Sequence, residues 1–454
     1  MKKVFLLVCL GVMSTFIGCK DDVTDPNIDG SKVAGYIYTT TNGQGINQVV
    51  RFSRLANGDL TNETAFSTNS LGGANVAVGG DAHGDYDFQG SIKMIGNYLL
   101  TVNSGGNNVS VFSVDHASGN LALLNNVPSG GKRPVSITST PVVGSSTEFW
   151  VIVANQWDNP NIQKAAPNIQ RFPNNAFFMQ DLTQPDASDQ LRNIQLFKFN
   201  TANGSLSPIN QLATFVRDNG GPSQVLFSPD GKKIAVSLWG IAHFGTPDPL
   251  LTEQHPSRVY IYDFNNGVAS NGRFFQESGI AGTIGIDWAP TNNNILYATN
   301  FNTTVAKTNN SLTVLTDGGT NVTKTANFST GTDTDLDEAC WTVISPSGDR
   351  LYVDSFTGNL ITPFQIGGNG ATLTKLPFEK RGDFSPAADS KDMYITKDNK
   401  YLYNTGAFQS FSINKFEITA GGVSYKKQFT LNTTKTGLGT AGAYNFMGLV
   451  GFDL

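Results

Sequence analysis

The sequence predicts an all-β protein, a seven-bladed β-propeller closed into a ring by its own C-terminal strand. Three observations support this prediction: a β-rich composition, a strand-and-turn unit that recurs along the chain, and a last segment that supplies a missing strand. The 454 residues include 48 glycines, 30 phenylalanines and 13 tyrosines. Short alternating runs bounded by Asn, Gly, Asp and Pro, without long stretches of helical apolar spacing, are typical of antiparallel sheets.

The clearest copy of the repeated unit begins at residue 222. Residues 222–231 form a strand closed by a Ser-Pro-Asp-Gly turn, residues 233–238 a second strand and residues 258–264 a third with period-two alternation. Residues 273–276 begin the fourth strand. Four antiparallel strands joined in chain order make one propeller blade, and repetition around an axis protects the edges of the sheets.

The second strands of the copies align along the whole body. Their last residues are Thr41, Asn103, Asn155, Trp239, Asn300, Phe356 and Gly406. The successive spacings are 62, 52, 84, 61, 56 and 50 residues, so each copy is about one blade long and the spacing of 84 marks an insertion. Seven copies predict seven blades.

The first copy, at residues 36–41, lacks a preceding inner strand. Residues 445–454 have the required strand character, so we expect the C-terminus to supply that strand and close the ring. An open ring would expose two sheet edges and two apolar blade faces to water.

The N-terminus predicts export and a lipid anchor. Lys2 and Lys3 precede an apolar run that ends at Gly18-Cys19, too short to span a bilayer but typical of a signal peptide. Residues 16–19 resemble a lipobox, which makes Cys19 the lipidated residue; a plain secretory peptide is the alternative. Residues 1–18 are the predicted signal peptide, 19–32 a flexible tether and 33–454 the propeller. The Lys20-Asp21-Asp22 segment resembles a signal for export to the outer face of the outer membrane, and a solvated tether is its other interpretation.

Composition limits the partners. Removal of Lys2 and Lys3 changes the formal net charge from −5 to −7, and the body contains no basic run, so nucleic acid is excluded as an expected partner. After removal of residues 1–18 only Cys19 and Cys340 remain, and with Cys19 lipidated the fold must be held by its core rather than by a disulfide.

The second strands and the segments around residues 228–231 and 339–348 resemble the seven-bladed lactonase-type (YVTN-repeat) propeller family. The resemblance covers roughly residues 33–454. The resemblance implies the propeller fold. It implies less strongly an activity of the kind described for phosphogluconolactonases and carboxymuconate cyclases. No nucleophile elbow, phosphate loop or dinucleotide fingerprint is present in the sequence context that each requires.

The topology of a propeller sorts the connections onto two faces. Turns between strands one and two, and between three and four, lie on one face, here the turn face. Connections between strands two and three, and between blades, lie on the other, here the loop face. Blades three and four carry long polar inserts at 156–193 and 240–257 on the loop face, and a loop of such length is typically functional or disordered. The candidate binding residues at these inserts are Trp157, Trp239, His243 and His255.

Connections between blades place charged residues around the mouth of the central channel. Lactone hydrolysis needs a base to activate water and a cation to stabilise the oxyanion. The candidate bases are Glu338, Asp337 and His83, and the candidate cations are Arg133 and Arg381. For each, fixing a loop through backbone hydrogen bonds is the structural alternative. Segment 332–338 is more typical of an acidic turn than of a metal cage, so the sequence predicts no cofactor, with a divalent cation such as Ca²⁺ as the less favoured interpretation.

Two functions therefore remain open. The first is a lipid-anchored binding module on the exterior of the outer membrane, holding a protein, a glycan or a small anionic ligand on its loop face. The second is a lactonase-like hydrolase, or a cyclase or isomerase, acting on a small anionic lactone at the channel mouth. The anchor, the polar inserts and the lack of a convincing catalytic set favour the first. Fold alone does not decide between them.

Overall fold

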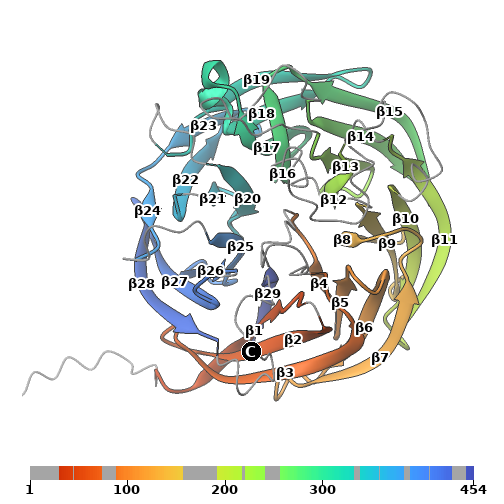
Figure 1. Cartoon of the computed structure of the whole chain (residues 1–454), viewed down its shortest axis with the longest axis vertical. Coiled ribbons are helices and arrows are strands. Elements are labelled where there is room, and N and C mark those ends of the chain that lie inside the picture. The colour runs from red at the N-terminus through yellow and green to blue at the C-terminus, as the bar shows by residue number, and fades with distance from the viewer. Residues whose placement is uncertain are drawn as a thin grey trace, which may run out of the picture.

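The computed structural model is a ring of blades around a single axis, seen end-on in Figure 1. It describes residues 30–43, 45–73, 88–156, 192–216, 220–240, 256–331, 338–356, 358–382, 389–407, 409–431 and 446–454. Within these residues the strands form seven antiparallel sheets. The all-β fold class, the seven blades and the closing C-terminal strand are thereby confirmed.

Each blade begins at the axis and runs outward in chain order, except the first, whose inner strand comes last in the sequence. Blade one comprises β29 (Met447–Asp453), β1 (Val33–Thr40), β2 (Ile46–Leu55) and β3 (Leu60–Leu71). Blade two comprises β4 (Ile92–Ile95), β5 (Tyr98–Asn103), β6 (Asn108–Val114) and β7 (Leu121–Pro128). Blade three comprises β8 (Pro134–Pro141), β9 (Glu148–Asn155), β10 (Asn193–Asn200) and β11 (Ser205–Thr214).

The remaining blades follow the same order. Blade four comprises β12 (Pro222–Phe227), β13 (Lys233–Leu238), β14 (Arg258–Asn265) and β15 (Val268–Gln276). Blade five comprises β16 (Ile280–Ala289), β17 (Asn292–Thr303), β18 (Leu312–Asp317) and β19 (Val322–Phe328), with the 3₁₀ turn η4 (Val305–Asn310) between β17 and β18. Blade six comprises β20 (Ala339–Ile344), β21 (Arg350–Ser355), β22 (Leu360–Gly367), the 3₁₀ turn η5 (Gly368–Gly370), β23 (Thr372–Lys375) and β24 (Glu379–Lys380). Blade seven comprises β25 (Ser390–Ile395), β26 (Tyr401–Gly406), β27 (Ser412–Thr419) and β28 (Gly422–Thr430).

The predicted strands of blade four are found with one difference. The fourth strand, β15, begins at Val268 rather than at Arg273. A two-residue hairpin of Asn266 and Gly267 joins it to β14, and both residues have positive φ, 45° and 91°. An Asn-Gly pair favours this tight turn because both positions of a type I′ turn need a left-handed backbone. The prediction therefore placed the start of the strand too late.

Ring closure is made by β29 against β1 (Figure 1). The two strands pair antiparallel from Gly35 opposite Asp453 to Thr40 opposite Met447. The Asp453 carboxylate accepts a 2.6 Å hydrogen bond from Nη2 of Arg54, a guanidinium that is almost entirely buried. The two ends of the chain are thus joined by a backbone ladder and a buried ion pair.

A tyrosine in the second strand bonds several blades to the next blade. The hydroxyls of Tyr38, Tyr297 and Tyr403 donate to backbone carbonyls in the strand-three-to-four turn of the neighbouring blade, at Gly119, Gly370 and Gly58, over 2.6–2.8 Å. These three glycines have φ of 68°, 86° and 80°, which side-chain-bearing residues rarely adopt. The tyrosine of the repeat therefore has a positional role, because it fixes the angle between adjacent blades on the turn face.

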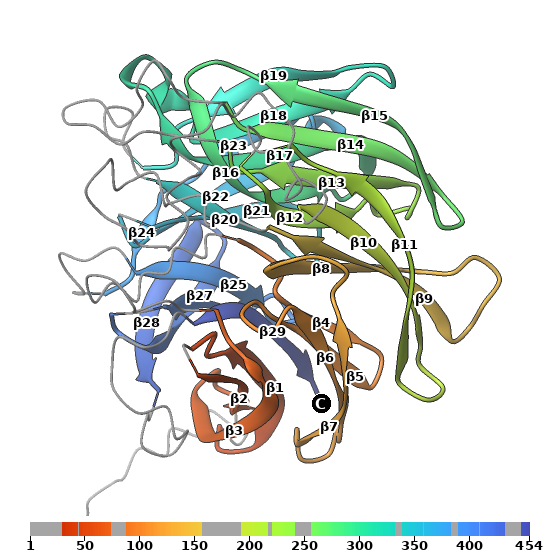
Figure 2. The same cartoon turned by 45° about the vertical axis from the view of Figure 1, so that its right-hand side comes forward.

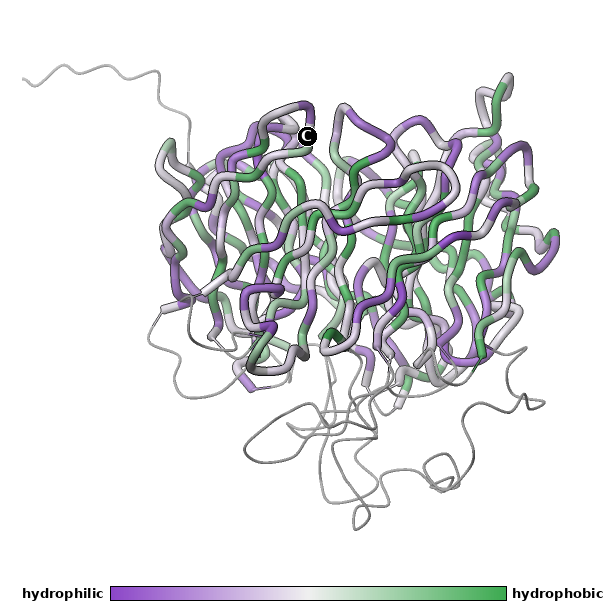
Figure 3. Tube along the Cα trace, turned by 90° about the horizontal axis from the view of Figure 1, so that it is seen from above, coloured by the Kyte–Doolittle hydropathy of each residue, from purple (hydrophilic) through white to green (hydrophobic). Residues whose placement is uncertain are grey.

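The cores lie between the blades, where adjacent sheets pack face to face (Figure 2). Hydrophobic and hydrophilic positions are interspersed along the strands in Figure 3. Cys340 is a buried free cysteine within one of these cores. In the part of the chain that the structure describes, no helix has the length and apolarity needed to cross a membrane.

Candidate functional site

Six of the residues singled out from the sequence fall outside the described residues. These are Cys19, His83, Trp157, His243, His255 and Asp337. Their assignments stay predictions, as does the divalent cation, because most of segment 332–338 is not described either. Within the described ranges, no three His, Cys, Asp or Glu side chains are grouped as metal ligands.

Glu338 and Arg133 occupy equivalent places in the fold and share an unusual backbone. Each immediately precedes the inner strand of its blade on the loop face, with φ of 52° and 55°. Apart from these two and Phe411, the described residues of positive φ are asparagine or glycine. The left-handed conformation is unfavourable for long side chains, and such strain concentrates at functional sites. The observation supports both residues as site candidates without assigning them a role.

Hydrogen bonds hold both strained backbones. The Glu338 carbonyl accepts from the Phe356 amide at 2.9 Å, and the Arg133 carbonyl accepts from the Gln156 amide at the same distance. The Arg133 amide in turn donates to Oδ1 of Asn107 at 2.8 Å. The main chain at these positions is therefore fixed by neighbouring elements.

Arg381 and Trp239 are buried. The Arg381 guanidinium donates to Oδ2 of Asp389 at 2.9 Å, and both side chains have 1% or less of their surface exposed. Trp239 is fully buried and packs on Phe301, with ring centroids 5.4 Å apart. Arg381 is thus part of a desolvated ion pair, and Trp239 is part of an aromatic contact between blades four and five.

The structure adds charged residues that the sequence reasoning did not select. Two adjacent side chains of β25, Lys391 and Asp392, are buried on the loop side of the axis, together with Asp354 at the end of β21. With the Arg381–Asp389 pair they form what we call the loop-side charge cluster: Asp354, Arg381, Asp389, Lys391 and Asp392. The sequence contained a signal, because Lys391 and Asp392 fall just before the second strand predicted to end at Gly406, where the inner strand of that blade has to lie.

Contacts within the cluster place its groups at the junction of blades six, seven and one. The Asp392 carboxylate accepts from the Gly448 amide of β29 at 2.7 Å. The Asp354 carboxylate accepts from Nδ2 of Asn404 at 2.9 Å. The Lys391 ammonium lies 5.4 Å from the ring centroid of Trp341 and 5.9 Å from that of Phe356. Aromatic faces attract a cation at such distances, so the ammonium is held between two rings.

Burial changes the proton affinity of the two newly found carboxyls. It raises the pKa of Asp392 to about 6, although the Gly448 amide and Lys391 oppose the change. Burial also raises the pKa of Asp354 well above its ordinary value, against the opposing effect of Arg381. A carboxyl with a pKa near 6 exchanges a proton close to neutral pH, which is the property that a general base requires.

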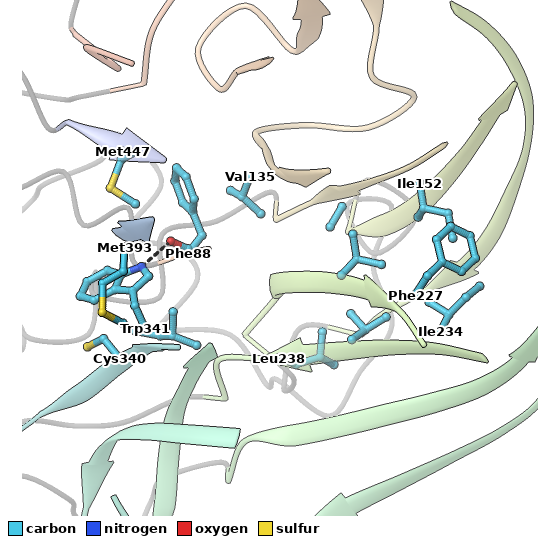
Figure 4. Close-up of a cluster of buried hydrophobic side chains, with 14 of the residues drawn as sticks. Phe88, Val135, Ile152, Phe227, Ile234, Leu238, Cys340, Trp341, Met393 and Met447 are labelled. Atoms are coloured by element: carbon cyan, nitrogen blue, oxygen red, sulfur yellow. Dashed lines mark hydrogen bonds between the residues drawn. The ribbon is translucent and has the colours of Figure 1, made fainter. Parts of the chain in front are cut away.

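Residues that precede blade two lie among the inner strands of the ring. Phe88 is buried among inner-strand side chains of several blades, including Val135, Met393 and Met447 (Figure 4). Its carbonyl accepts from Nε1 of Trp341 at 2.8 Å, the bond drawn in Figure 4. We call Phe88, Gln89 and Trp341 the axial plug.

Gln89 extends the plug across the ring. Its side chain donates to the Thr342 carbonyl at 2.6 Å and accepts from the Thr342 amide at 3.0 Å, while its own amide donates to the Ser223 carbonyl. The plug therefore links the segment before blade two to blades four and six.

These features define the class of protein: a closed seven-bladed propeller whose loop side carries a buried cluster of acids and cations above a plugged axis. Neither a protein-family model nor a curated protein matches the sequence. Solved structures do match, and they have the same fold.

Two of the similar structures come from bacteria. A putative 6-phosphogluconolactonase from Bacteroides fragilis is 14% identical with a TM-score of 0.57, covering 92% of this chain and 98% of that one. The periplasmic gluconolactonase of Pseudomonas aeruginosa is 11% identical with a TM-score of 0.60, covering 92% and 99%. The resemblance to lactonase-type propellers is therefore confirmed for the fold.

Proposed function

We propose that the chain is a lactonase-like hydrolase that opens a small cyclic ester on the loop side of blades six and seven. The observation that carries the proposal is Asp392, a buried carboxylate with a pKa near neutrality whose neighbour in the strand is the cation Lys391. The fold shared with a gluconolactonase supports the same choice. Sequence reasoning had ranked a binding module first, and these two observations favour its alternative.

The cluster contains the groups that the chemistry needs. Asp392 takes a proton from water as the water oxygen bonds to the lactone carbonyl carbon. The negative charge then develops on the carbonyl oxygen, where the cation Lys391 stabilises it. Breakage of the ring C–O bond returns the proton to the leaving alkoxide, which gives a hydroxy acid. The Glu338 carbonyl fixes the loop-face backbone through the Phe356 amide, and the rings of Trp341 and Phe356 hold the Lys391 ammonium.

The experiment compares lactone hydrolysis by the purified protein with that by Asp392→Asn. A panel of aldonolactones, with and without a phosphate, is followed by acid release after subtraction of spontaneous hydrolysis. We expect Asp392→Asn to lower kcat/KM by about 10²–10⁴, the usual contribution of a general base. The wild-type rate should rise with pH through about 6 and level off above it, because the base works only when deprotonated.

The matched control is Asp398→Asn, which changes an aspartate of the same blade on the turn face with a half-exposed side chain. It should keep both the rate and the pH profile. Hydrolysis of no lactone, or equal rates in wild type and Asp392→Asn, would refute the catalytic proposal and favour the binding module.

The proposal includes the lipid anchor. Cys19 as the lipidated residue would tether the propeller to the outer membrane of a bacterium, facing the exterior. In a bacterial host we expect the full chain in the membrane fraction, with an incorporated labelled fatty acid, and Cys19→Ala without either. A Cys19→Ala chain that is labelled and sedimented like the wild type would contradict the anchor.

A further inference from the structure

The strand that carries the proposed base is bulged at the base itself. Lys391 and Asp392 of β25 together stand opposite the single residue Thr405 of β26. Nδ2 of Asn404 fixes the bulge by donating to the Lys391 carbonyl at 2.8 Å. Oγ1 of Thr405 does the same for the Asp392 carbonyl at 3.3 Å. Bulges change the direction of a side chain and are enriched beside active sites, so the local backbone itself aims the Asp392 carboxylate.

The closing strand has a bulge of its own, at Gly448. The register of β29 with β1 passes from Met447 to Leu449 and leaves out Gly448. Its φ of 74° is one that side-chain-bearing residues rarely adopt. A Cβ atom at this position would also collide with Oγ of Ser91 and Cγ2 of Ile92, at the start of blade two. The bulge therefore requires glycine for two separate reasons.

This bulge makes a backbone donor available to Asp392. Gly448 stands outside the β1 register, and its amide donates instead to Oδ2 of Asp392 at 2.7 Å. Both residues are buried. A hydrogen bond from an amide to a carboxylate is charge-assisted and about twice as strong as one between neutral groups. The last strand of the chain thus supplies the donor that orients the proposed base.

The same level of the other blades shows what is particular to Asp392. Asp392 directly precedes Met393, which pairs with the residue two before the end of the aligned second strand. The residues that precede the equivalent pairs in the other blades are small and buried: Gly448, Ser91, Ser136, Ser223, Gly285 and Cys340. Of these seven described positions, only the one in blade seven carries a charge.

A charge is not needed to link one inner strand to the next. Oγ of Ser136 accepts from the Val225 amide of blade four at 3.2 Å, and Oε1 of Gln224 accepts from the Ile286 amide of blade five at 2.6 Å. Neutral side chains therefore make the same kind of contact between other neighbouring blades. A carboxylate is far more costly to bury than a hydroxyl or an amide. This comparison favours a chemical role for Asp392 over a purely structural one.

We propose that Gly448 is a positioning residue of the hydrolytic centre: the amide that its bulge makes available holds the Asp392 carboxylate, and the centre is complete only when β29 closes the ring. The catalytic consequence rests on the proposed function, whereas the contact between the two residues does not. A chain whose ring is open lacks this donor. Hydrolysis is therefore coupled to the last step of ring assembly.

The amide acts on the protonation of Asp392 as well as on its position. Burial raises the pKa of this carboxyl to about 6, and backbone hydrogen bonds from Gly448 and Gly90 oppose the change. Of the charged groups in the described ranges, Lys391 on the same strand favours the ionised form and Asp354 of blade six opposes it. A donor to the ionised form lowers a pKa, so loss of the Gly448 amide must raise the pKa of Asp392.

The test removes the donor in two ways. Gly448→Ala distorts the bulge through the collisions of its Cβ atom. Glycolic acid at position 448, introduced by stop-codon suppression during in vitro translation of the full chain, gives an ester that has no N–H and adds no side chain. The first control, Gly58→Ala, places a Cβ against the Tyr401 ring at another glycine of positive φ, 80°, on the turn face. The second, Gly421→Ala, places a Cβ where nothing lies within 4 Å.

Two measurements follow the effect on Asp392. Carbon NMR of carboxyl-labelled aspartate reports its titration, with Asp392→Asn assigning the signal, and the pH profile of kcat/KM on the lactone panel reports activity. We expect the midpoint of Asp392 to rise by about one pH unit or more in both Gly448 variants, because a hydrogen bond to a charged group is lost. The rising limb of the rate profile should move by the same amount. Neither Gly58→Ala nor Gly421→Ala should move the midpoint.

The outcomes separate this inference from the proposed function. An unchanged midpoint in a folded Gly448 variant, or an equal rise in Gly58→Ala, would overturn the inference. If Gly448→Ala did not fold, the ester would carry the test, because it keeps the geometry of glycine. A shifted titration with an unmoved rate profile would overturn the coupling to hydrolysis. If the wild type hydrolysed no lactone, the proposed function would fail, and the titration would still decide whether Gly448 holds the carboxylate.

Discussion

Deletion of the last ten residues, 445–454, is expected to prevent the chain from folding into a stable ring. The deletion removes β29 and its six paired positions along β1. It also removes the buried side chains of Phe446, Met447 and Leu449. Burial of a large apolar side chain contributes about 1.5–3 kcal/mol, so these three account for roughly 5–9 kcal/mol. Whole domains are stable by only about 5–15 kcal/mol.

Electrostatics and edge exposure add to the loss. Without Asp453, the buried Arg54 guanidinium loses its carboxylate partner. The Asp392 carboxylate loses the amide of Gly448. β1 becomes an unpaired edge, which is a template for association with other chains. We therefore expect the truncated chain to be aggregated or to unfold without a cooperative transition, measured by circular dichroism on heating and by sedimentation.

The control deletes Leu454 alone. This side chain is 62% exposed, and only its backbone bond to Ala34 is lost, so the change in the free energy of unfolding should be within about 1 kcal/mol. A synthetic peptide of residues 445–454, added in excess during refolding, should restore the transition by mass action. A truncated chain that melts like the full chain would contradict closure by β29.

Most of the fold was predictable because the residues of each blade contain their own pattern of strands and turns. The second strands predicted to end at Asn103 and Gly406 do end there, as β5 and β26, because short strand-forming runs bounded by turn residues recur at the spacing of one blade. Closure of the ring was predicted from the number of strands in each copy. The first copy lacks an inner strand, so another segment of the chain has to supply it. The correct start of β15 could also have been predicted from the sequence, because the Asn-Gly pair that begins at Asn266 is typical of a tight hairpin turn.

The interior of the ring was not predictable in the same way. Phe88 and Gln89 follow a stretch of polar residues and carry no periodic signal, yet they cross the axis to contact blades four and six. Such contacts depend on which segments the closed ring brings together, and no local pattern records them. For the same reason Arg381, predicted at a channel mouth, is instead buried against Asp389.

The Arg381–Asp389 pair leads to the second large effect, the loss of stability in Asp389→Ala. Asp389 is fully buried and is the acceptor for several donors at once. Besides the Arg381 guanidinium, the amides of Gln409 and Ser410 donate to it at 2.9 and 3.0 Å, and Oγ of Ser410 donates at 2.6 Å. Alanine would leave these donors and a buried cation without the carboxylate. Removal of one partner of a buried pair costs about 3–5 kcal/mol, and we expect a loss of at least that size in denaturant unfolding.

The hydrogen-bond donors around Asp389 predict that replacing Asp389 lowers the free energy of unfolding more than replacing Arg381 does. In Arg381→Met the Asp389 carboxylate keeps the two amides and the Ser410 hydroxyl, so the free energy of unfolding should fall less than in Asp389→Ala. The double variant Arg381→Met/Asp389→Leu removes both charges and should be more stable than Asp389→Ala alone, because a buried ion pair can be replaced by apolar groups at little cost. The control Asp398→Ala changes a half-exposed carboxylate and should cost below about 1 kcal/mol. Equal losses in Asp389→Ala and Asp398→Ala would mean that the buried network contributes nothing specific, and Arg381 would then regain its sequence-based interpretation as a cation free to meet a ligand.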